Sequence, residues 1–324
     1  MIKSKIYKEI SKHEIEKIVV DLYGSNSKLL SSEILKGGLF NTTYLLHTDQ
    51  DKEGLVLRVG PVNKHLLYNF EKDMMAAEPM FHKMLQDNGI PTSNVLKFSP
   101  ENTVIDRDYI VIEYIHTIPM NHESLNNVDM SYVYEEVGSL ANQLHQIKSD
   151  KFGWLRQDNW GLYDKWSDFI SAFGAESADK AEEYDLFTKA EIEQFSSIIK
   201  ENKTVLDQIT VPNYVHFDLW QGNVLLSKEK DAYKVAAVID LDRTIFGDKY
   251  WDLSTPWIIN DAFLKGYKDH PEKTVEYKTR EHIYKLLLGF LSSYVCLIQY
   301  DDMDWFKREK ESTLFLLAAD INRL

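Results

Sequence analysis

The 324-residue sequence contains a single cysteine, Cys296. One cysteine excludes an intramolecular disulfide and any cysteine-rich zinc site, and it is compatible with a reducing compartment. Residues 1–9 are charged and lack the apolar segment that a secretory signal needs. We therefore expect a cytoplasmic protein.

The sequence also lacks an apolar run long enough to cross a bilayer. The longest run, residues 286–298, is interrupted by Ser292 and Ser293, so it fits a buried core helix better. The 51 acidic residues outnumber the 37 basic ones, which gives a formal charge of −14. This charge repels nucleic acid and anionic membranes, and we expect neither as a partner. It would suit a cationic ligand, although many proteins are acidic merely for solubility.

No internal repeat, low-complexity tract or Gly/Ser linker occurs, so a boundary between lobes must be a short hinge. The length suits two packed lobes better than one. Segments 28–35, 42–47 and 55–59 have β-strand character and are separated by turn residues, which predicts an antiparallel meander. A helix up to Asn88 and a buried strand at 109–115 complete a small N-terminal lobe.

The rest of the chain is mostly helical in pattern. Short β-like pieces interrupt it between residues 211 and 253, where they alternate with polar residues of catalytic type. The predicted fold class is α+β, with a small antiparallel β-sheet lobe at residues 1–115 and a larger, mainly helical lobe at 116–324. Apolar residues at helical spacing predict helices at 132–147, 189–209, 278–300 and 305–321.

The motif with the clearest chemistry is His216-Phe217-Asp218, followed by Asn223 and, seventeen residues later, by Asp240-Leu241-Asp242. Kinases combine the pattern His-x-Asp-x-x-x-x-Asn with a metal-binding aspartate further along the chain. Fragments of the pattern arise by chance elsewhere, as in His47-Thr48-Asp49. At 216–242 all the elements occur in order, in a strand-loop-strand context.

Phosphoryl transfer needs a carboxylate that accepts the proton of the acceptor hydroxyl, and oxygen ligands that hold magnesium against the phosphates. Asp218 suits the first task. Asn223 and Asp240 suit the second, because an amide and a carboxylate both coordinate magnesium and leave sites for phosphate and water. We expect His216 to orient the catalytic loop.

A Walker-type phosphate loop is absent, because no Gly-x-x-x-x-Gly-Lys-Ser/Thr pattern occurs. Gly37 and Gly38 instead precede two predicted strands that lead to a basic residue, Arg58. Their backbone amides are candidates for contact with phosphate, and Asn41 could assist them. A simple turn between strands is the alternative explanation of the glycine pair.

These motifs resemble those of the aminoglycoside phosphotransferases, whose relatives include choline, homoserine and ketosamine (fructosamine) kinases. The resemblance runs through most of the chain. It implies a protein-kinase-like bilobal fold with ATP, or GTP, and Mg²⁺ in the cleft. Besides the catalytic motif, it rests on segments 37–41, 55–59, 89–91, 111–115, 144–147 and 247–253.

Within this resemblance, Arg58 takes the place of the usual kinase lysine. Strand alternation separates it from the apolar face of segment 55–59, so it can face the nucleotide and grip phosphate oxygens. Its expected helix partner is Glu78, with Glu71 as the alternative. Pro79 should either start a new helical segment or kink the helix next to Glu78.

The resemblance also assigns supporting residues. Backbone groups of Glu113 and Ile115 would bind adenine at the hinge between the lobes. Asp242 resembles an acidic residue of antibiotic kinases and would contact magnesium indirectly. Asp248 and Asp252 would anchor the loop after the metal site through hydrogen bonds.

The acceptor is a small molecule that the motifs do not identify. The acidic segment 301–304 could bind a cation, with Trp251, Trp257 and Trp305 available for stacking, but the same acids suit a helix N-terminus. We rank an aminoglycoside-like or other cationic, polyhydroxylated acceptor first. The sequence does not indicate an oligomeric state.

Two alternatives remain open. Trp220 and Gly222 match the loop of ketosamine kinases, which favours a ketosamine acceptor, whereas Asp240-Leu241-Asp242 matches antibiotic kinases. A catalytically silent nucleotide-binding module is the alternative of another class, because the strand lysine is missing.

Overall fold

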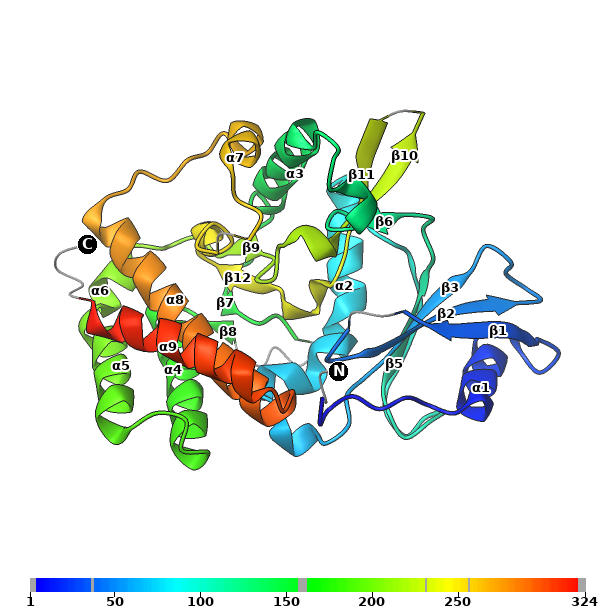
Figure 1. Ribbon diagram of the computed structural model, residues 1–324, viewed down its shortest axis with the longest axis horizontal. Coiled ribbons are helices and arrows are strands. Elements are labelled where there is room, and N and C mark those ends of the chain that lie inside the picture. The colour runs from blue at the N-terminus through cyan, green and yellow to red at the C-terminus, as the bar shows by residue number, and fades with distance from the viewer. Residues whose placement is uncertain (1–3, 36–37, 157–161, 231, 256, 320–324) are drawn as a thin grey trace.

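The computed structural model describes residues 4–35, 38–156, 162–230, 232–255 and 257–319. An antiparallel sheet in the order β1-β2-β3-β5-β4 forms the N-terminal part (Figure 1). The meander predicted from the sequence is confirmed, because β1 pairs with β2 and β2 with β3 in antiparallel fashion. The strands are β1 (Leu29–Ile34), β2 (Thr42–Thr48), β3 (Leu55–Val59), β4 (Val95–Ser99) and β5 (Tyr109–Glu113).

The two faces of β3 meet different helices. Leu55, Leu57 and Val59 pack with helix α1 (Lys12–Tyr23) in one apolar cluster. Val56 packs on the other side against a cluster that contains Met75 of helix α2 (Met74–Asp87). Arg58 shares this second face by strand alternation and therefore points towards α2.

Helix α2 lies between the sheet and the remainder of the protein (Figure 1). Met75 faces the sheet, whereas Phe81 and Leu85 belong to a second apolar cluster with residues of the C-terminal part. The helix begins at Met74, five residues before Pro79, so of the two alternatives for Pro79 the start of a new helical segment is excluded. A 3-10 helix at Asn69–Asp73 already supplies the turn that leads into α2.

The C-terminal part is mainly helical and contains two small antiparallel sheets, in the orders β11-β10-β6 and β8-β7-β12-β9. The α+β fold class is confirmed. Its strands are β6 (Ile118–Pro119), β7 (Phe152–Gly153), β8 (Leu162–Tyr163), β9 (Asn213–Val215), β10 (Val224–Glu229), β11 (Ala232–Val238) and β12 (Ile245–Gly247). Its helices are α3 (Ser131–Leu144), α4 (Trp166–Glu183), α5 (Lys189–Glu201), α6 (Lys203–Leu206), α7 (Asp261–Tyr267), α8 (Val275–Tyr294) and α9 (Met303–Ala318).

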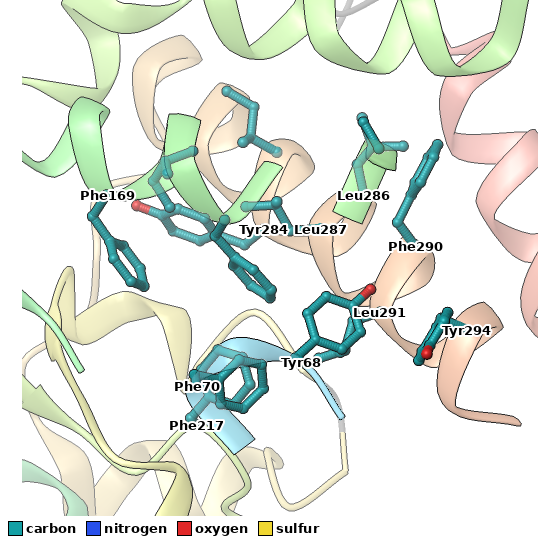
Figure 2. Close-up of a cluster of buried hydrophobic side chains, with 14 of the residues drawn as sticks. Tyr68, Phe70, Phe169, Phe217, Tyr284, Leu286, Leu287, Phe290, Leu291 and Tyr294 are labelled. Atoms are coloured by element: carbon teal, nitrogen blue, oxygen red, sulfur yellow. The ribbon is translucent and has the colours of Figure 1, made fainter. Parts of the chain in front are cut away.

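An aromatic core fills the helical part and reaches the N-terminal segments. Figure 2 shows Tyr68 and Phe70 beside Phe217 and side chains of α8. Trp251 lies in the same core, fully buried and stacked on Tyr284 with ring centroids 4.3 Å apart. The expectation that Trp251 could stack on an acceptor is therefore wrong.

The apolar run at 286–298 is confirmed as part of a core helix. Helix α8 continues into a π-helix, Val295–Gln299, and buries residues around most of its circumference. The expectation that no apolar stretch is long enough to cross a bilayer is wrong by length and composition, because in the described part of the chain Val275–Gln299 is one such helix. More than half of its apolar window is buried inside the protein, as in core helices generally.

Helices α3 and α7 cross at two glycines. A methyl group built on Gly138 would lie 2.0 Å from the carbonyl oxygen of Phe263, and one built on Gly266 would lie 1.8 Å from that of Glu135. Real side-chain carbons never approach backbone this closely, so the crossing needs both glycines.

Gly138→Ala and Gly266→Ala should therefore each lower the free energy of unfolding by about 1–3 kcal/mol, because the helices must separate to admit the methyl group. Urea denaturation measures this effect. Ser139→Ala, which adds no atom to the neighbouring position of α3, is the matched control. A Gly138→Ala protein as stable as this control would show that the crossing tolerates a side chain.

Candidate active site

The hairpin of β10 and β11 places Asn223 next to Asp240. Val224 pairs with Val238 at the base of the hairpin, and the Ile239 N–H donates to the Asn223 carbonyl at 3.0 Å. Asn223 directly precedes β10, and Asp240 follows β11 after Ile239. The two residues therefore lie at the same end of the hairpin. Asp240 has a left-handed backbone, with φ of 62°, which aspartate tolerates better than most residues.

The loop that carries Asp218 is held by a buried carboxylate. Asp252 is 3% exposed and accepts hydrogen bonds from the backbone N–H groups of His216 and Phe217, both at 2.8 Å. Phe217 has φ of 72°, a strained value for a bulky residue, and these bonds help to hold it. His145 contacts the same carboxylate at 3.1 Å. Asp252 therefore anchors the loop before Asp218.

His216 lies behind the loop with its side chain fully buried. Its Nε2 lies 3.0 Å from the Ile239 carbonyl, so the imidazole connects the loop to the strand end that precedes Asp240. The Asp218 N–H reaches the other ring nitrogen at 3.4 Å. This position fits the loop-orienting role expected for His216.

Asn223 turns its amide nitrogen towards Asp218. The Nδ2 atom donates to the Asp218 carbonyl at 2.8 Å and lies 3.4 Å from its carboxylate. The amide oxygen of Asn223 is thereby oriented away from Asp218 and can act as a ligand. With Asp240 it forms an oxygen donor pair of the kind that Mg²⁺ prefers.

Arg58 joins three carboxylates. It pairs with Glu78 through one terminal nitrogen, and through the other with Asp240 at 2.7 Å and Asp242 at 3.0 Å. Burial alone would lower the pKa of Arg58, but the three carboxylates raise it above its ordinary value. The guanidinium therefore carries a permanent charge. Of the two glutamates considered from the sequence, Glu78 and not Glu71 is its helix partner.

Glu78 is fully buried and has a second neighbour, His82, one turn further along α2 at 3.5 Å. The other ring nitrogen of His82 lies 2.8 Å from the Thr92 hydroxyl, which donates to the Val238 carbonyl at 3.0 Å. A chain of contacts thus leads from Arg58 to the end of β11.

Asp242 is also buried, at 3% exposure. Burial raises the pKa of its carboxyl above the ordinary value, as does the charge of Asp240, whereas Arg58 acts in the opposite direction. Asn41 donates to Asp242 at 3.4 Å, so the loop after β1 reaches the metal-motif segment directly.

The glycine pair is described in part, since Gly37 lies outside the described residues. A methyl group on Gly38 would lie 3.0 Å from the Asn41 carbonyl oxygen, so the loop turns tightly here. Asn41, at the end of this turn, reaches the Asp242 carboxylate.

Glu113 and Ile115 lie apart from these contacts. Strand β5 ends at Glu113, two residues before the predicted end, and 114–115 lead towards β6. Glu113 donates its N–H to the Asn94 carbonyl at 2.9 Å, and the Ile115 carbonyl accepts from Thr117 at 2.9 Å. Both residues are on the connection between the first sheet and the C-terminal part.

Arg243 belongs to the same site, although the sequence patterns did not predict it as a site residue. It pairs with Glu71 at 3.3 Å, so the second glutamate of the expected pair has its own arginine. Its position three residues after Asp240 was the one hint in the sequence. This position alone does not distinguish a site arginine from an arginine on the surface.

The acidic segment 301–304 has structural partners. Asp302 caps α9 by accepting from the Trp305 N–H, as the helix explanation predicts, and Asp301 pairs with Lys5 at 2.9 Å. Trp257 and Trp220 are 48% and 37% exposed, and the Gln221 side chain donates to the Trp257 carbonyl. Exposed aromatic faces thus lie on and beside the loop that carries Asp218.

Comparison with known families gives one match over most of the chain. The model of the phosphotransferase enzyme family matches residues 32–281. No curated protein sequence matches the chain.

Solved structures share the fold at low sequence identity, and they confirm the protein-kinase-like bilobal fold. The aminoglycoside phosphotransferase APH(4)-Ia has 18% identity and a TM-score of 0.69, over 96% of this chain and 100% of that chain. A protein of Haemophilus somnus 129PT assigned as a fructosamine-3-kinase has 17% identity and a TM-score of 0.66, over 94% and 96%. A thermostable APH(4)-Ia mutant, in complex with AMP-PNP and hygromycin B, has 18% identity and a TM-score of 0.64, over 95% and 100%.

Asp252→Asn should lower the free energy of unfolding by about 1–3 kcal/mol, because an amide has one acceptor oxygen for the two N–H groups that Asp252 now binds. Thermal and urea denaturation measure the change. Asp150→Asn, the same substitution at an exposed residue, should leave stability unchanged. Equal stability of the two variants would mean that the carboxylate does not anchor the loop.

Proposed function

Because the chain belongs to the phosphotransferase enzyme family and is accordingly a small-molecule phosphotransferase, we propose that it transfers the terminal phosphoryl group of ATP or GTP to a hydroxyl group. One observation carries this proposal. Asp218, Asn223 and Asp240 converge at the end of one hairpin, and Arg58 reaches Asp240 from the N-terminal sheet.

Asp218 is the proposed catalytic base. Its backbone is fixed on one side by Asp252 through the preceding residues, and on the other by the amide of Asn223. A base held in this way can accept the hydroxyl proton without first reorienting. His216 positions the loop from behind and does not itself touch the acceptor.

Asn223 and Asp240 are the proposed magnesium ligands, with Asp242 acting indirectly. Bound magnesium would neutralise charge on the phosphates during transfer. Among the described residues no group of three or more His, Cys, Asp or Glu could hold a metal alone. Magnesium sites in proteins use one or two carboxylates and complete their shell with substrate phosphates and water, so Asn223 and Asp240 would suffice as protein ligands.

The nucleotide would lie between the two parts of the fold, with residues 1–115 as the nucleotide-binding lobe and 116–324 as the catalytic and substrate-binding lobe. Gly37, Gly38 and Asn41 approach the phosphates in this proposal. Arg58, oriented by Glu78, binds phosphate oxygens, for which its planar guanidinium is suited. Backbone groups of Glu113 and Ile115 recognise the base.

For the acceptor we propose an aminoglycoside-like or other cationic, polyhydroxylated small molecule. The net charge of −14 and the exposed rings of Trp220 and Trp257 support a cationic or sugar-like ligand. A ketosamine is the second candidate, favoured by Trp220 and Gly222: a methyl group on Gly222 would lie 2.3 Å from the Trp220 ring, so the glycine lets this ring fold over the loop. We also propose a cytoplasmic location, with neither nucleic acid nor a membrane as a partner, because the net charge of −14 repels both polyanions and anionic membranes.

Asp218→Asn should reduce acceptor-stimulated turnover by about 10²–10⁴-fold, because the amide cannot accept a proton. The measurement is release of ADP or GDP with magnesium, against aminoglycosides, choline, homoserine, ketosamines and macrolides. Asp179→Asn, at an exposed position of α4, is the matched control and should retain full turnover.

An Asp218→Asn protein with wild-type turnover would exclude Asp218 as the base. Nucleotide binding by the wild type without turnover on any acceptor would favour the catalytically silent module.

A further inference from the structure

Arg243 is a charged residue beside the proposed active site that the proposed function leaves without a role. It ends the short 3-10 helix Leu241–Arg243, directly after Asp240. Its side chain is 17% exposed, whereas that of its partner Glu71 is fully buried. Arg243 thus lies at the border between the protein interior and the solvent.

The surroundings of Arg243 hold it in one orientation. Its guanidinium lies over the Phe40 ring, 5.6 Å from the centroid, and Phe40 precedes Asn41 in the loop after β1. One terminal nitrogen pairs with Glu71 at 3.3 Å. The guanidinium is therefore placed between the proposed phosphate loop and the proposed metal segment.

Glu71 is itself fixed by two donors. The Tyr68 N–H donates to its carboxylate at 2.9 Å, and the side-chain amide of Gln299, at the end of the π-helix, donates at 2.6 Å. Burial raises the pKa of Glu71, and Arg243 opposes this rise. A carboxylate with this many donors is suited to orient an arginine.

The charges around Arg243 differ from those around Arg58. Three carboxylates bind Arg58, whereas among the described residues Glu71 is the carboxylate that pairs with Arg243. Burial alone would lower the pKa of Arg243, but its acidic neighbours, which include Asp218, raise it above its ordinary value. Arg243 is a permanent cation whose remaining N–H groups can bind an anion.

We propose that Arg243 is a second phosphate-binding arginine, which contacts the phosphoryl group in transfer, and that Glu71 is the positioning residue that orients it. This inference rests on the proposed function. In the reaction, the bond from the terminal phosphorus to its bridging oxygen breaks and a bond to the acceptor oxygen forms. The hydroxyl proton passes to Asp218 and the nucleoside diphosphate leaves.

The physical need for such a cation follows from the charges of the cleft. Asp218, Asp240 and Asp242 repel a triphosphate, and Arg58 is shared among three carboxylates. Charge spreads over the equatorial oxygens of the phosphoryl group during transfer, and a guanidinium placed there stabilises it. A contact with the terminal phosphate alone should change affinity for a triphosphate and not for a diphosphate.

The test compares the affinities for AMP-PNP and ADP, measured by calorimetry with excess magnesium. Removing Arg243 alone would leave Glu71 buried and unpaired, so the comparison uses Glu71→Gln and the double variant Glu71→Gln with Arg243→Gln. Arg308→Gln, at an exposed position of α9, is the control for lost charge. Circular dichroism and thermal denaturation establish that each variant is folded.

Relative to Glu71→Gln, the double variant should bind AMP-PNP at least about tenfold more weakly and bind ADP with unchanged affinity. Arg308→Gln should match the wild type for both. Equal changes for both nucleotides, or no change, would overturn the inference and leave the proposed function intact. A wild type that binds neither these nucleotides nor their guanine counterparts GMP-PNP and GDP overturns both.

Discussion

The guanidinium of Arg58 joins three carboxylates that come from distant parts of the chain. Glu78 reaches it from α2, and Asp240 and Asp242 reach it from the segment after β11. Glu78 and Asp242 are buried, and leaving either charge unpaired would be costly, so the strand, the helix and the hairpin end are constrained together. The position of Asn223 relative to Asp240 depends on the same hairpin, and with it the proposed magnesium site.

A second set of contacts fixes the loop that carries Asp218, the proposed catalytic base. Asp252 holds the backbone of His216 and Phe217, and the Phe217 ring packs in the aromatic core (Figure 2). The strained backbone of Phe217 is thus supported by a buried carboxylate and by packing. Asp218 follows this support directly, whereas the groups that would meet the acceptor, such as Trp220, remain exposed.

Local patterns predicted much of this fold because they reflect local physics. The alternation in segment 55–59 predicted the side of the strand on which Arg58 lies. The order of residues in 216–242 predicted the location of the proposed active site. Tertiary packing decided the rest. The expected helix 189–209 divides at Asn202, whose side chain bonds the Ile198 carbonyl. Helix α4 was missed although its buried residues, such as Trp166, Ile170 and Phe173, recur at helical spacing. Helix α1 was missed although Ser11 and Glu14 form a capping box. Glu71 and Arg243 pair with each other although 172 residues separate them in the sequence, and no spacing rule predicts such a contact.

The proposed function requires that the carboxylates around Arg58 form a site for a magnesium-bound nucleotide. Titration of the wild type and Asp240→Asn with AMP-PNP, with and without magnesium, tests this most directly. We predict that magnesium increases the affinity of the wild type at least about tenfold and leaves that of Asp240→Asn unchanged. Affinity of the wild type that does not depend on magnesium would contradict the account.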